Sequence, residues 1–249
     1  MVETLRFREK VVIVTGGGSG IGRATALAFA REGAHVAVAD VSEKDGLETA
    51  DTISRNAGIS TFFLTDVSQS VSVNNLVAST INTFGRLDVY FSNAGIFDYF
   101  TPCMTASDEF WDRLIRTDLS SCFYSARAAF PHLSKTKGSI VMTGSVTSFR
   151  SSGAGVAYTA AKHGLVGLVK QLACEFASEG VRVNGVAPGP IHTSIVRNVE
   201  SDATVIAHVP LGRFGKPEEI AEPVLFLASS ASSFITGAML PVDGGWLLK

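Results

Sequence analysis

Short apolar runs alternate with longer segments of helical periodicity along most of this chain. Runs of this kind, rich in β-branched residues, are typical of strands that are buried on both faces of a sheet. They occupy residues 11–14, 35–39, 61–66, 87–92, 139–143, 182–193 and 240–245. Because segments of helical periodicity lie between them, we predict an α/β fold with one parallel sheet and helices on both faces.

Residues 107–135 form a long helical pattern in which apolar side chains nearly encircle the axis. Phe110, Trp111, Leu119 and Phe123 are among them. A helix that is apolar all round is buried on more than one side. We therefore expect this stretch to pack on the sheet and also on a partner subunit.

Composition narrows the class of protein. The 249 residues are 46% hydrophobic and 18% charged, which predicts a single domain over residues 1–249. A net charge of -2 gives no reason to expect a nucleic-acid or membrane partner. The charged first ten residues carry no signal-peptide core and no apolar run spans a bilayer, so a cytoplasmic protein is expected. We expect the three cysteines to be buried and reduced, and the histidines lack metal-ligand spacing, so we expect no metal.

A glycine-rich turn joins the first predicted strand to the first predicted helix. Gly16, Gly20 and Gly22 stand in a Thr-Gly-x-x-x-Gly-x-Gly pattern, with Ser19 and Ile21 between them. Glycines allow the backbone to approach a pyrophosphate, and the helix N-terminus supplies free N–H groups and a positive dipole end. The turn therefore predicts a phosphate site, and a purely structural turn is the alternative.

Asp40 ends the second predicted strand, where a carboxylate can accept hydrogen bonds from both adenosine ribose hydroxyls and repel a 2′-phosphate. Val41 and Ser42 bring no arginine to bind such a phosphate, so NAD is favoured over NADP. A helix N-cap is a compatible second role for Asp40.

Two further strand ends point to the same edge of the sheet and are candidates for the adenine side and the central turn of the site. They are Asp66-Val67 and Asn93-Ala94-Gly95.

Tyr158 and Lys162 stand four residues apart in a helical pattern, so their side chains share one face. The pKa of an unperturbed tyrosine is near ~10, and a fixed ammonium beside the ring favours the phenolate. The pair therefore suits acid–base chemistry, although such a pair is also common on a solvated helix surface. Ser145 ends the fifth predicted strand, and read alone it also fits a simple turn.

Taken together, these motifs resemble the short-chain dehydrogenase/reductase family over essentially the whole chain. The matching positions are residues 15–22, Asp66-Val67, Asn93-Ala94-Gly95, Ser145, Tyr158-x-x-x-Lys162, Asn184, Pro188-Gly189 and Thr193. The resemblance implies a Rossmann-like, doubly wound, three-layer α/β/α sandwich with seven parallel strands in the order 3-2-1-4-5-6-7. It also implies a homotetramer.

The same resemblance implies roles for individual residues. Tyr158 would be the general acid or base, and Lys162 would hold the nicotinamide ribose and lower the pKa of the tyrosine. Ser145 would bind the substrate oxygen, and Ile191 and Thr193 would meet the carboxamide of the cofactor. For Thr193, an N-cap of the segment that follows is a second, compatible role.

Asp118 departs from the family pattern, because the family usually carries an asparagine at this point of the long helix. In the family that residue helps to hold a water that passes protons from the lysine to solvent. An ionised Asp118 keeps an acceptor and the backbone carbonyl but lacks the amide donor. We expect Asp118 to support the relay still; the alternative is a residue that only distorts the helix locally.

Substrate contacts are expected from the loops that follow the fourth to sixth strands. The candidates are Ile96, Phe97, Tyr99, Val146, Phe149, Arg150 and Pro190, with residues 193–213 as a lid. These mostly apolar and aromatic residues suit a compact alicyclic or aromatic substrate. The segments 93–99 and 158–164 are similar to those of cis-dihydrodiol dehydrogenases. Arg150 either binds a substrate carboxylate or lies at the surface or a subunit contact.

These features together predict an NAD-dependent oxidoreductase that interconverts a secondary alcohol and its ketone by hydride transfer, acting on a CH–OH group. A 3-oxoacyl-thioester reductase is one alternative, against which Asp40 argues because those reductases mostly use NADPH. A catalytically weak NAD-binding regulatory protein is another. Such relatives tend to lose the tyrosine or the lysine, whereas this chain retains Tyr158, Lys162 and Ser145.

Overall fold

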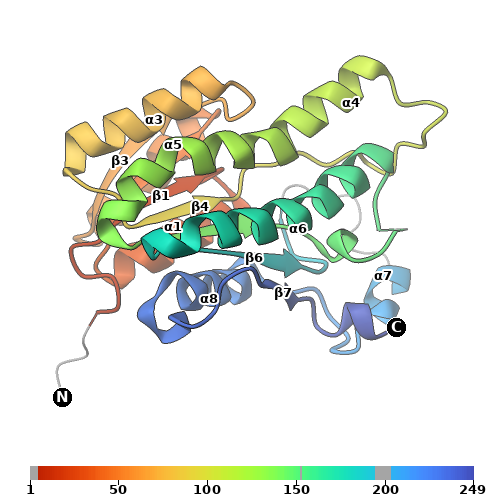
Figure 1. Ribbon diagram of the computed structural model, residues 1–249. Helices are drawn as coiled ribbons and strands as arrows, with labels where there is room; N and C mark the ends of the chain where they lie inside the picture. Colours follow the sequence, from red (N-terminus) through yellow and green to blue (C-terminus); the bar gives the residue numbers. More distant parts are fainter. Residues whose placement is uncertain (1–4, 152, 194–202) are drawn as a thin grey trace.

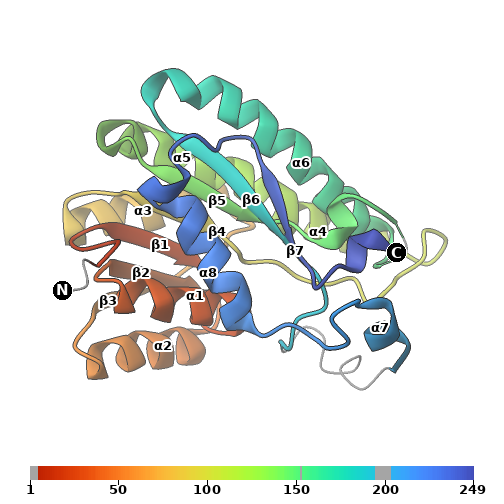
Figure 2. The same cartoon turned by 90° about the horizontal axis from the view of Figure 1, so that it is seen from below.

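A computed structural model of the chain describes residues 5–151, 153–193 and 203–249. Its centre is a seven-stranded parallel sheet in the order β3-β2-β1-β4-β5-β6-β7 (Figure 2). The strands are β1 Val11–Thr15, β2 His35–Asp40, β3 Ile59–Leu64, β4 Val89–Ser92, β5 Ser139–Thr143, β6 Arg182–Pro188 and β7 Met239–Val242. The prediction of an α/β fold with this strand order is confirmed.

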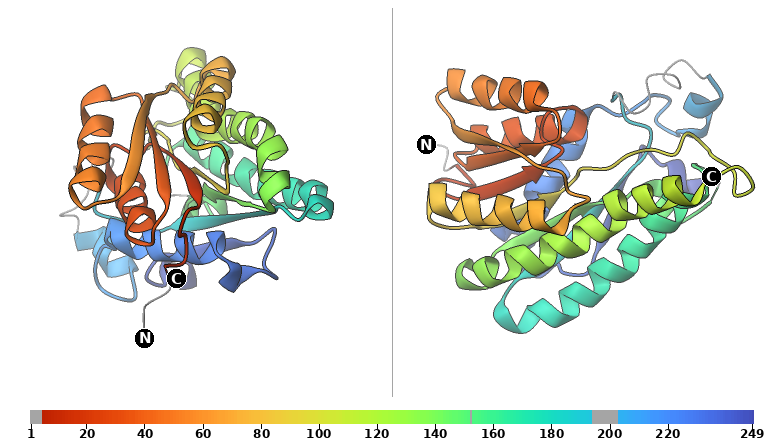
Figure 3. Two further views of the ribbon diagram at one scale, coloured as in Figure 1. Left: turned by 90° about the vertical axis from the view of Figure 1, so that its left-hand side faces the viewer. Right: turned by 90° about the horizontal axis from the view of Figure 1, so that it is seen from above.

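Helices cover both faces of the sheet (Figures 1 and 3). One layer contains α1 Gly20–Arg31, α2 Glu43–Arg55 and α8 Pro217–Ala228. The other contains α3 Ser70–Phe84, α5 Ser121–Thr136 and α6 Val156–Phe176. The remaining helices, α4 Asp108–Ile115 and α7 Ala203–His208, lie beyond the carboxyl edge of the strands, which leaves that edge to be enclosed by loops.

Alternating residues of each strand build two separate hydrophobic cores, because successive side chains point to opposite faces of a sheet. Val12 and Val14 of β1 join the core beneath α1 and α8. Ile13 between them joins the core beneath α3, α5 and α6. Burial on both faces explains why these strands are apolar at every position rather than at every second one.

The helix predicted over residues 107–135 is interrupted by a π-helical turn, Arg116–Ser120, which joins α4 to α5. Thr117 and Ser121 donate their hydroxyls to the carbonyls four residues earlier, at Arg113 and Thr117. Such side-chain bonds compete with the regular ladder and bend helices. The turn brings Asp118, which is 1% exposed, into the interior of the molecule.

Several boundaries and environments differ from the predictions. β3 begins at Ile59 rather than residue 61, and β6 ends at Pro188, so the segment that leads to residue 193 is a loop. The expectation of three buried cysteines is wrong for two of them, because Cys122 is buried whereas Cys103 and Cys174 are exposed.

In the described part of the chain, no helix is long and apolar enough to cross a membrane, and no cluster of residues fits a metal ion.

Candidate active site

A cavity of about 640 Å³ opens at the carboxyl edge of the sheet, between the glycine-rich turn and the first turns of α6. Parallel sheets of this kind bind ligands where the strand order reverses, which here is between β1 and β4. The cavity's volume falls in the ~300–1,000 Å³ range of small-molecule sites. Both halves of the chain contribute residues to its walls.

The glycine-rich turn is built for close backbone approach. Gly16 has a φ of +64°, and a Cβ there would lie 2.9 Å from the Cα of Ala94. A Cβ on Gly22 would lie 1.9 Å from the carbonyl oxygen of Gly16, so only glycine allows α1 to start this close to the turn. Ser19 is the N-cap of α1 and makes no side-chain cap, which leaves the first N–H groups of the helix for a ligand. The residues present therefore fit a pyrophosphate.

Asp40 lies at the same end of the cavity, at the last position of β2. Its Oδ2 accepts a hydrogen bond from Gly18 N at 2.8 Å, and its Oδ1 accepts one from Ser42 N at 2.9 Å. Each carboxylate oxygen retains a lone pair for a further donor such as a ribose hydroxyl. The N-cap of α2 is Ser42, whose hydroxyl accepts from Asp45 N, so Asp40 is not needed as a helix cap.

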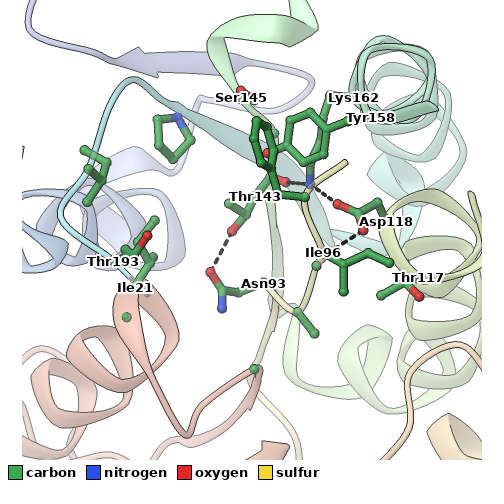
Figure 4. Close-up of a pocket in the computed structure, with 18 of the residues that line it drawn as sticks. Ile21, Asn93, Ile96, Thr117, Asp118, Thr143, Ser145, Tyr158, Lys162 and Thr193 are labelled. Carbon is green, nitrogen blue, oxygen red and sulfur yellow. Dashed lines mark hydrogen bonds and ion pairs between the residues drawn. The ribbon is translucent and has the colours of Figure 1, made fainter. Parts of the chain in front are cut away.

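Asn93 connects the strands on either side of the strand-order reversal. Its Nδ2 donates to the carbonyl of Thr15 at 3.1 Å, and its Oδ1 accepts from the Thr143 hydroxyl at 3.2 Å (Figure 4). The hydroxyl of Thr15 in turn accepts from the N–H groups of Asn93 and Ala94. This network holds the ends of β1, β4 and β5 in one fixed arrangement around the floor of the cavity.

Lys162 is buried at the centre of the site and is held from two sides (Figure 4). Its Nζ donates to the backbone carbonyl of Thr143 at 3.0 Å and lies 3.1 Å from Oδ2 of Asp118. The ammonium also stands 5.2 Å from the centre of the Tyr158 ring. The other carboxylate oxygen of Asp118 accepts from Ile96 N at 2.8 Å, which ties the π-helical turn to the end of β4.

Burial and charge together set the protonation behaviour of this group of residues. Burial alone would lower the pKa of Lys162, but the carboxylate of Asp118 and the phenol of Tyr158 raise it above its usual value. Burial also raises the pKa of Tyr158; Lys162 and Ser145 oppose this effect, whereas Asp118 and Asp98 add to it. The ammonium acts in the expected direction, yet the pKa of the tyrosine lies above its ordinary value.

Asp118 is thus both a residue of a distorted helical turn and a charged partner of Lys162. Burial raises the pKa of its carboxyl group, while the nearby ammonium and the N–H of Ile96 work against that rise. The helix distortion expected at Asp118 is thus confirmed, whereas its support of a proton relay stays a prediction. Its carboxylate lies within reach of the lysine, where an asparagine could offer only a neutral amide.

Ser145 is oriented by a short 3₁₀ turn, Val146–Ser148, at the end of β5. Its hydroxyl oxygen accepts from Thr147 N at 3.2 Å, and its own N–H donates to the Ser148 hydroxyl at 3.1 Å. Because the oxygen is used as an acceptor, the hydroxyl hydrogen is available for the cavity and for Tyr158. The turn role and a position in the site therefore coexist.

The cavity collects nearly all the residues singled out from the sequence. Its lining includes the catalytic candidates Ser145, Tyr158, Lys162 and Asp118, and every cofactor candidate except Gly22, which acts through packing. Of the substrate candidates, Ile96, Phe97, Val146 and Pro190 line it. Residues 194–202 of the expected lid lie outside the described residues; the lid's Thr193 and Val205 line the cavity.

Phe149 and Arg150 do not line the cavity, contrary to the prediction for Phe149 and to one of the two predictions for Arg150; the exposure of Arg150 agrees with the other, a surface position. The ring of Phe149 is 43% exposed, and the guanidinium of Arg150 donates to the carbonyl of the last residue, Lys249. Tyr99 is likewise exposed and does not line the cavity, whereas Phe97 and Phe100 do.

Other lining residues were missed in the sequence. They include Phe100, Arg113, Thr117, Thr143 and Trp246. Arg113 and Thr117 stand four apart on one helical face, next to Asp118, which is a signal that the sequence did contain. Thr143 acts through its backbone carbonyl, for which no residue type is diagnostic, and Trp246 comes from a distant part of the chain.

Comparison with known proteins identifies the family to which this chain belongs. A family model described as enoyl-(acyl carrier protein) reductase matches residues 16–247. The chain belongs to the short-chain dehydrogenase/reductase family. It is 40% identical over 245 residues to the short chain dehydrogenase/reductase astE of Aspergillus oryzae, covering 95% of this chain and 94% of that protein.

Two further relatives differ in their named activities. Cis-4-hydroxycyclohexanecarboxylate dehydrogenase of Sinomonas cyclohexanicum is 39% identical, over 96% of this chain and 97% of that protein. The 3-oxoacyl-[acyl-carrier-protein] reductase FabG of Thermotoga maritima is 36% identical, over 98% of this chain and 100% of that protein. Among solved structures, that of gox2181 superposes with a TM-score of 0.95 at 33% identity, covering 99% of each chain. The chain is therefore a dehydrogenase/reductase, and NAD or NADP is the cofactor of its family.

Proposed function

We propose that this protein is an NAD-dependent oxidoreductase that interconverts a secondary alcohol and its ketone by hydride transfer. The observation that carries the proposal is the placement of Tyr158, Lys162 and Ser145 at one end of a cavity whose other end holds the glycine-rich turn and Asp40. A nicotinamide bound across that cavity supplies the hydride chemistry, accepting a hydride from an alcohol or giving one to a ketone.

In the direction of oxidation, the phenolate of Tyr158 takes the proton from the substrate hydroxyl. Ser145 donates a hydrogen bond to the substrate oxygen and holds it against the tyrosine, which fixes the carbinol carbon for hydride departure. The ammonium of Lys162 stabilises the phenolate by its positive charge. In the reverse direction, Tyr158 returns the proton to the oxygen of the ketone as it gains negative charge.

The cofactor is proposed to lie along residues from both halves of the chain. They are Gly16, Ser19, Gly20, Ile21, Asp40, Val41, Asp66, Val67, Asn93, Ala94, Gly95, Tyr158, Lys162, Pro188, Gly189, Ile191 and Thr193, with Gly22 in support. NAD is preferred in this proposal because a 2′-phosphate on the ribose would meet the carboxylate of Asp40. The exposed Val41 that follows brings no compensating cation.

The substrate is proposed to be a compact ring compound, alicyclic or aromatic. Ile96, Phe97, Val146 and Pro190 give the substrate end of the cavity a predominantly apolar wall. The named activity of the Sinomonas relative, on a hydroxylated cyclohexane ring, supports this class. The relative named as a 3-oxoacyl reductase supports the alternative of a thioester reductase, which would be expected to prefer NADPH.

The proposal is tested first by cofactor binding and then by turnover. NADH and NADPH are titrated separately against the fluorescence of Trp111 and Trp246, in the natural protein, in Asp40→Ala and in the surface control Asp51→Ala. We expect tighter binding of NADH, with the preference lost only in Asp40→Ala. Preference for NADPH would reject the role of Asp40 and favour the thioester reductase.

A panel of ring and acyclic secondary alcohols with NAD then tests the reaction. Reduction of NAD by ring alcohols is expected, and tight NADH binding with no turnover at any pH would instead favour a regulatory protein.

We also propose a cytoplasmic homotetramer, in keeping with the exposed Trp111 and Phe123 on α4 and α5. Light scattering that gives a monomer at micromolar concentration would reject the tetramer.

A further inference from the structure

Asp98 is a fully buried carboxylate in the loop between β4 and α4, and the mechanism described above does not use it. Its Oδ1 accepts from Gly155 N at 2.7 Å and from Phe100 N at 3.3 Å. Its Oδ2 accepts from Tyr158 N at 3.0 Å. In the described part of the chain no cation forms an ion pair with Asp98, so backbone N–H groups are the partners that stabilise its charge.

These bonds make Asp98 the cap of the catalytic helix. The N-cap position of α6 is Gly155, which has no side chain to bind the free N–H groups of the first turn. Asp98, 60 residues before Tyr158, binds one of these N–H groups, that of Tyr158 itself. A Cβ on residue 155 would lie 2.6 Å from Oδ2 of Asp98, so glycine at the N-cap is what lets the carboxylate approach.

The same loop forms the aromatic side of the cavity. Phe97 and Phe100, here called the aromatic wall, both line it, and the ring of Phe97 packs edge-on against Tyr158 with centroids 5.1 Å apart. Tyr99 and Phe100 have φ values of +48° and +62°, a region that non-glycine residues avoid. Such strain persists only where surrounding contacts over-determine the backbone. The bonds that Asp98 accepts from Phe100 N, within this strained pair, and from Thr101 N, just after it, are contacts of that kind.

A second connection joins the loop to the helix close by. The loop passes the N-terminus of α6 (Figure 1), where Val156 N donates to the carbonyl of Thr101 at 3.2 Å and Thr101 N donates to the carbonyl of Asp98 at 2.9 Å. The aromatic wall and the first turn of α6 are therefore joined through Asp98 and the residues next to it.

We propose that Asp98 is a positioning residue that fastens the aromatic wall to the first turn of α6, and that this linkage sets a preference for ring-shaped over acyclic secondary alcohols. The proposal rests on the proposed function for its choice of substrates. A ring is large enough to reach Phe97 while its oxygen lies at Tyr158, whereas a small acyclic alcohol needs only Tyr158 and Ser145. Displacing the wall therefore penalises the ring more than the acyclic alcohol.

The test compares kcat/KM for cyclohexanol and for isopropanol with NAD in Asp98→Asn. Asparagine keeps the size of the side chain, but only one of its two polar atoms accepts, so one of the helix bonds is lost. We expect the ratio of the two kcat/KM values to fall by about tenfold, within the range for loss of a few apolar contacts. In the Phe97→Ala background the same substitution should alter the ratio much less, because the ring it positions is absent.

The matched control is Asp88→Asn, which changes another buried carboxylate that binds a backbone N–H but lies at the amino edge of the sheet. It should lower the thermal stability and leave the substrate ratio unchanged. If Asp98→Asn also leaves the ratio unchanged, Asp98 only maintains the fold and the proposal is rejected.

Hydrogen exchange on the natural protein tests the linkage without any variant. The amides of Gly155 and Tyr158 should exchange as slowly as those in the middle of α6, because both donate to a buried acceptor. Rapid exchange at Tyr158 would reject the linkage even if Asp98→Asn failed to fold. If the natural protein oxidised neither alcohol but showed this protection, the proposed function would fail while the linkage stood.

Discussion

Buried carboxylates lie at both edges of the sheet, but their partners differ. At the amino edge, Asp88 accepts from Val11 N and from the guanidinium of Arg86, and pairs with Lys10. Both cations are more than 40% exposed. At the carboxyl edge, Asp118 pairs with Lys162, which is itself buried, and in the described chain its Oδ2 has no aligned hydrogen bond beyond that ion pair.

This difference in partners separates a carboxylate that stabilises the fold, Asp88, from one that lies next to ionisable groups of the candidate site, Asp118. The charge of Asp88 is fully hydrogen-bonded and its cations remain in contact with water, so the cluster joins β1 to β4 without perturbing a reactive group. Asp118 and Lys162 have both lost their water, so each depends on the other for its charge state. A charge in such surroundings raises the pKa of Tyr158, which a solvated pair would not do.

Removing the cation at each edge gives the largest expected contrast. Lys162→Met leaves Asp118 buried without its partner and Tyr158 without the ammonium. We expect turnover to fall by about 10²–10⁴-fold, and the free energy of unfolding to fall by about 3 kcal/mol, or about 6–12 °C in Tm.

Arg86→Met is the matched change at the amino edge. Because Arg86 is partly solvated and Asp88 keeps Lys10 and Val11 N, the loss should be about 1 kcal/mol or less. Turnover of the folded enzyme should be unchanged. Calorimetry and steady-state kinetics on both variants test this contrast. Equal losses of turnover in Lys162→Met and Arg86→Met would contradict it.

Neutralising the carboxylates comes next in size. In the proposed mechanism oxidation needs the phenolate of Tyr158, so the rate of oxidation should rise as pH climbs through the pKa of that residue. Asp118→Asn removes a negative charge that disfavours the phenolate, so the pKa of Tyr158 falls and the rising limb of the pH–rate profile moves to lower pH. The plateau rate should change only a few-fold, since the neighbouring groups stay in place.

Asp88→Asn should leave that profile where it is. It should instead reduce the free energy of unfolding by about 2 kcal/mol, because a charged acceptor of several bonds is lost. A profile at saturating cofactor distinguishes the two when it is measured from about pH 6 up to the highest pH at which the protein stays folded, because the pKa of Tyr158 lies above its ordinary value. A shift to higher pH in Asp118→Asn, or a gain in plateau rate of orders of magnitude, would contradict the view that Asp118 supports the site.

The smallest effect is expected at a carboxylate that is not buried. Asp51 pairs with Arg55 one turn further along α2, and both side chains are more than 60% exposed. Asp51→Asn should change the free energy of unfolding by less than about 0.5 kcal/mol and leave the kinetics unchanged. A larger loss would mean that burial is not what distinguishes these carboxylates.

Features of the fold and site that depend on local sequence patterns could be predicted, whereas features that depend on distant or backbone contacts could not. The strands and the sheet order were predictable, because their apolar runs and the family motifs at their ends are local patterns. The glycine-rich turn, Ser145, Tyr158 and Lys162 were predicted from local patterns too, and the structure places them around one cavity. Phe149 was misassigned, and Arg150 was left between two alternatives, because a position just after a strand places a residue near the site without giving the direction of its side chain.

The features that were missed depend on distant or backbone partners. The bond of Asp98 to Tyr158 spans 60 residues, and the contact of Lys162 with Thr143 uses a carbonyl. A local helix distortion at Asp118 was one alternative from the sequence, but a π-helical turn over Arg116–Ser120 was not predicted, since an apolar pattern near 3.6 residues per turn continues through it.

Because of that turn, the site depends on the number of residues between α4 and α5 as well as on their identity. A π-helical turn takes one residue more than a turn of α-helix, so deleting one residue between positions 116 and 120 would let α4 and α5 join as one regular helix. The extra residue is accommodated within the turn, so the helices on either side would keep nearly the same faces. The carboxylate of Asp118 would lose the position from which it meets Lys162 and Ile96 N. In this segment, therefore, a deletion that improves helical regularity would be expected to impair the site while leaving the packing of α4 and α5 largely in place.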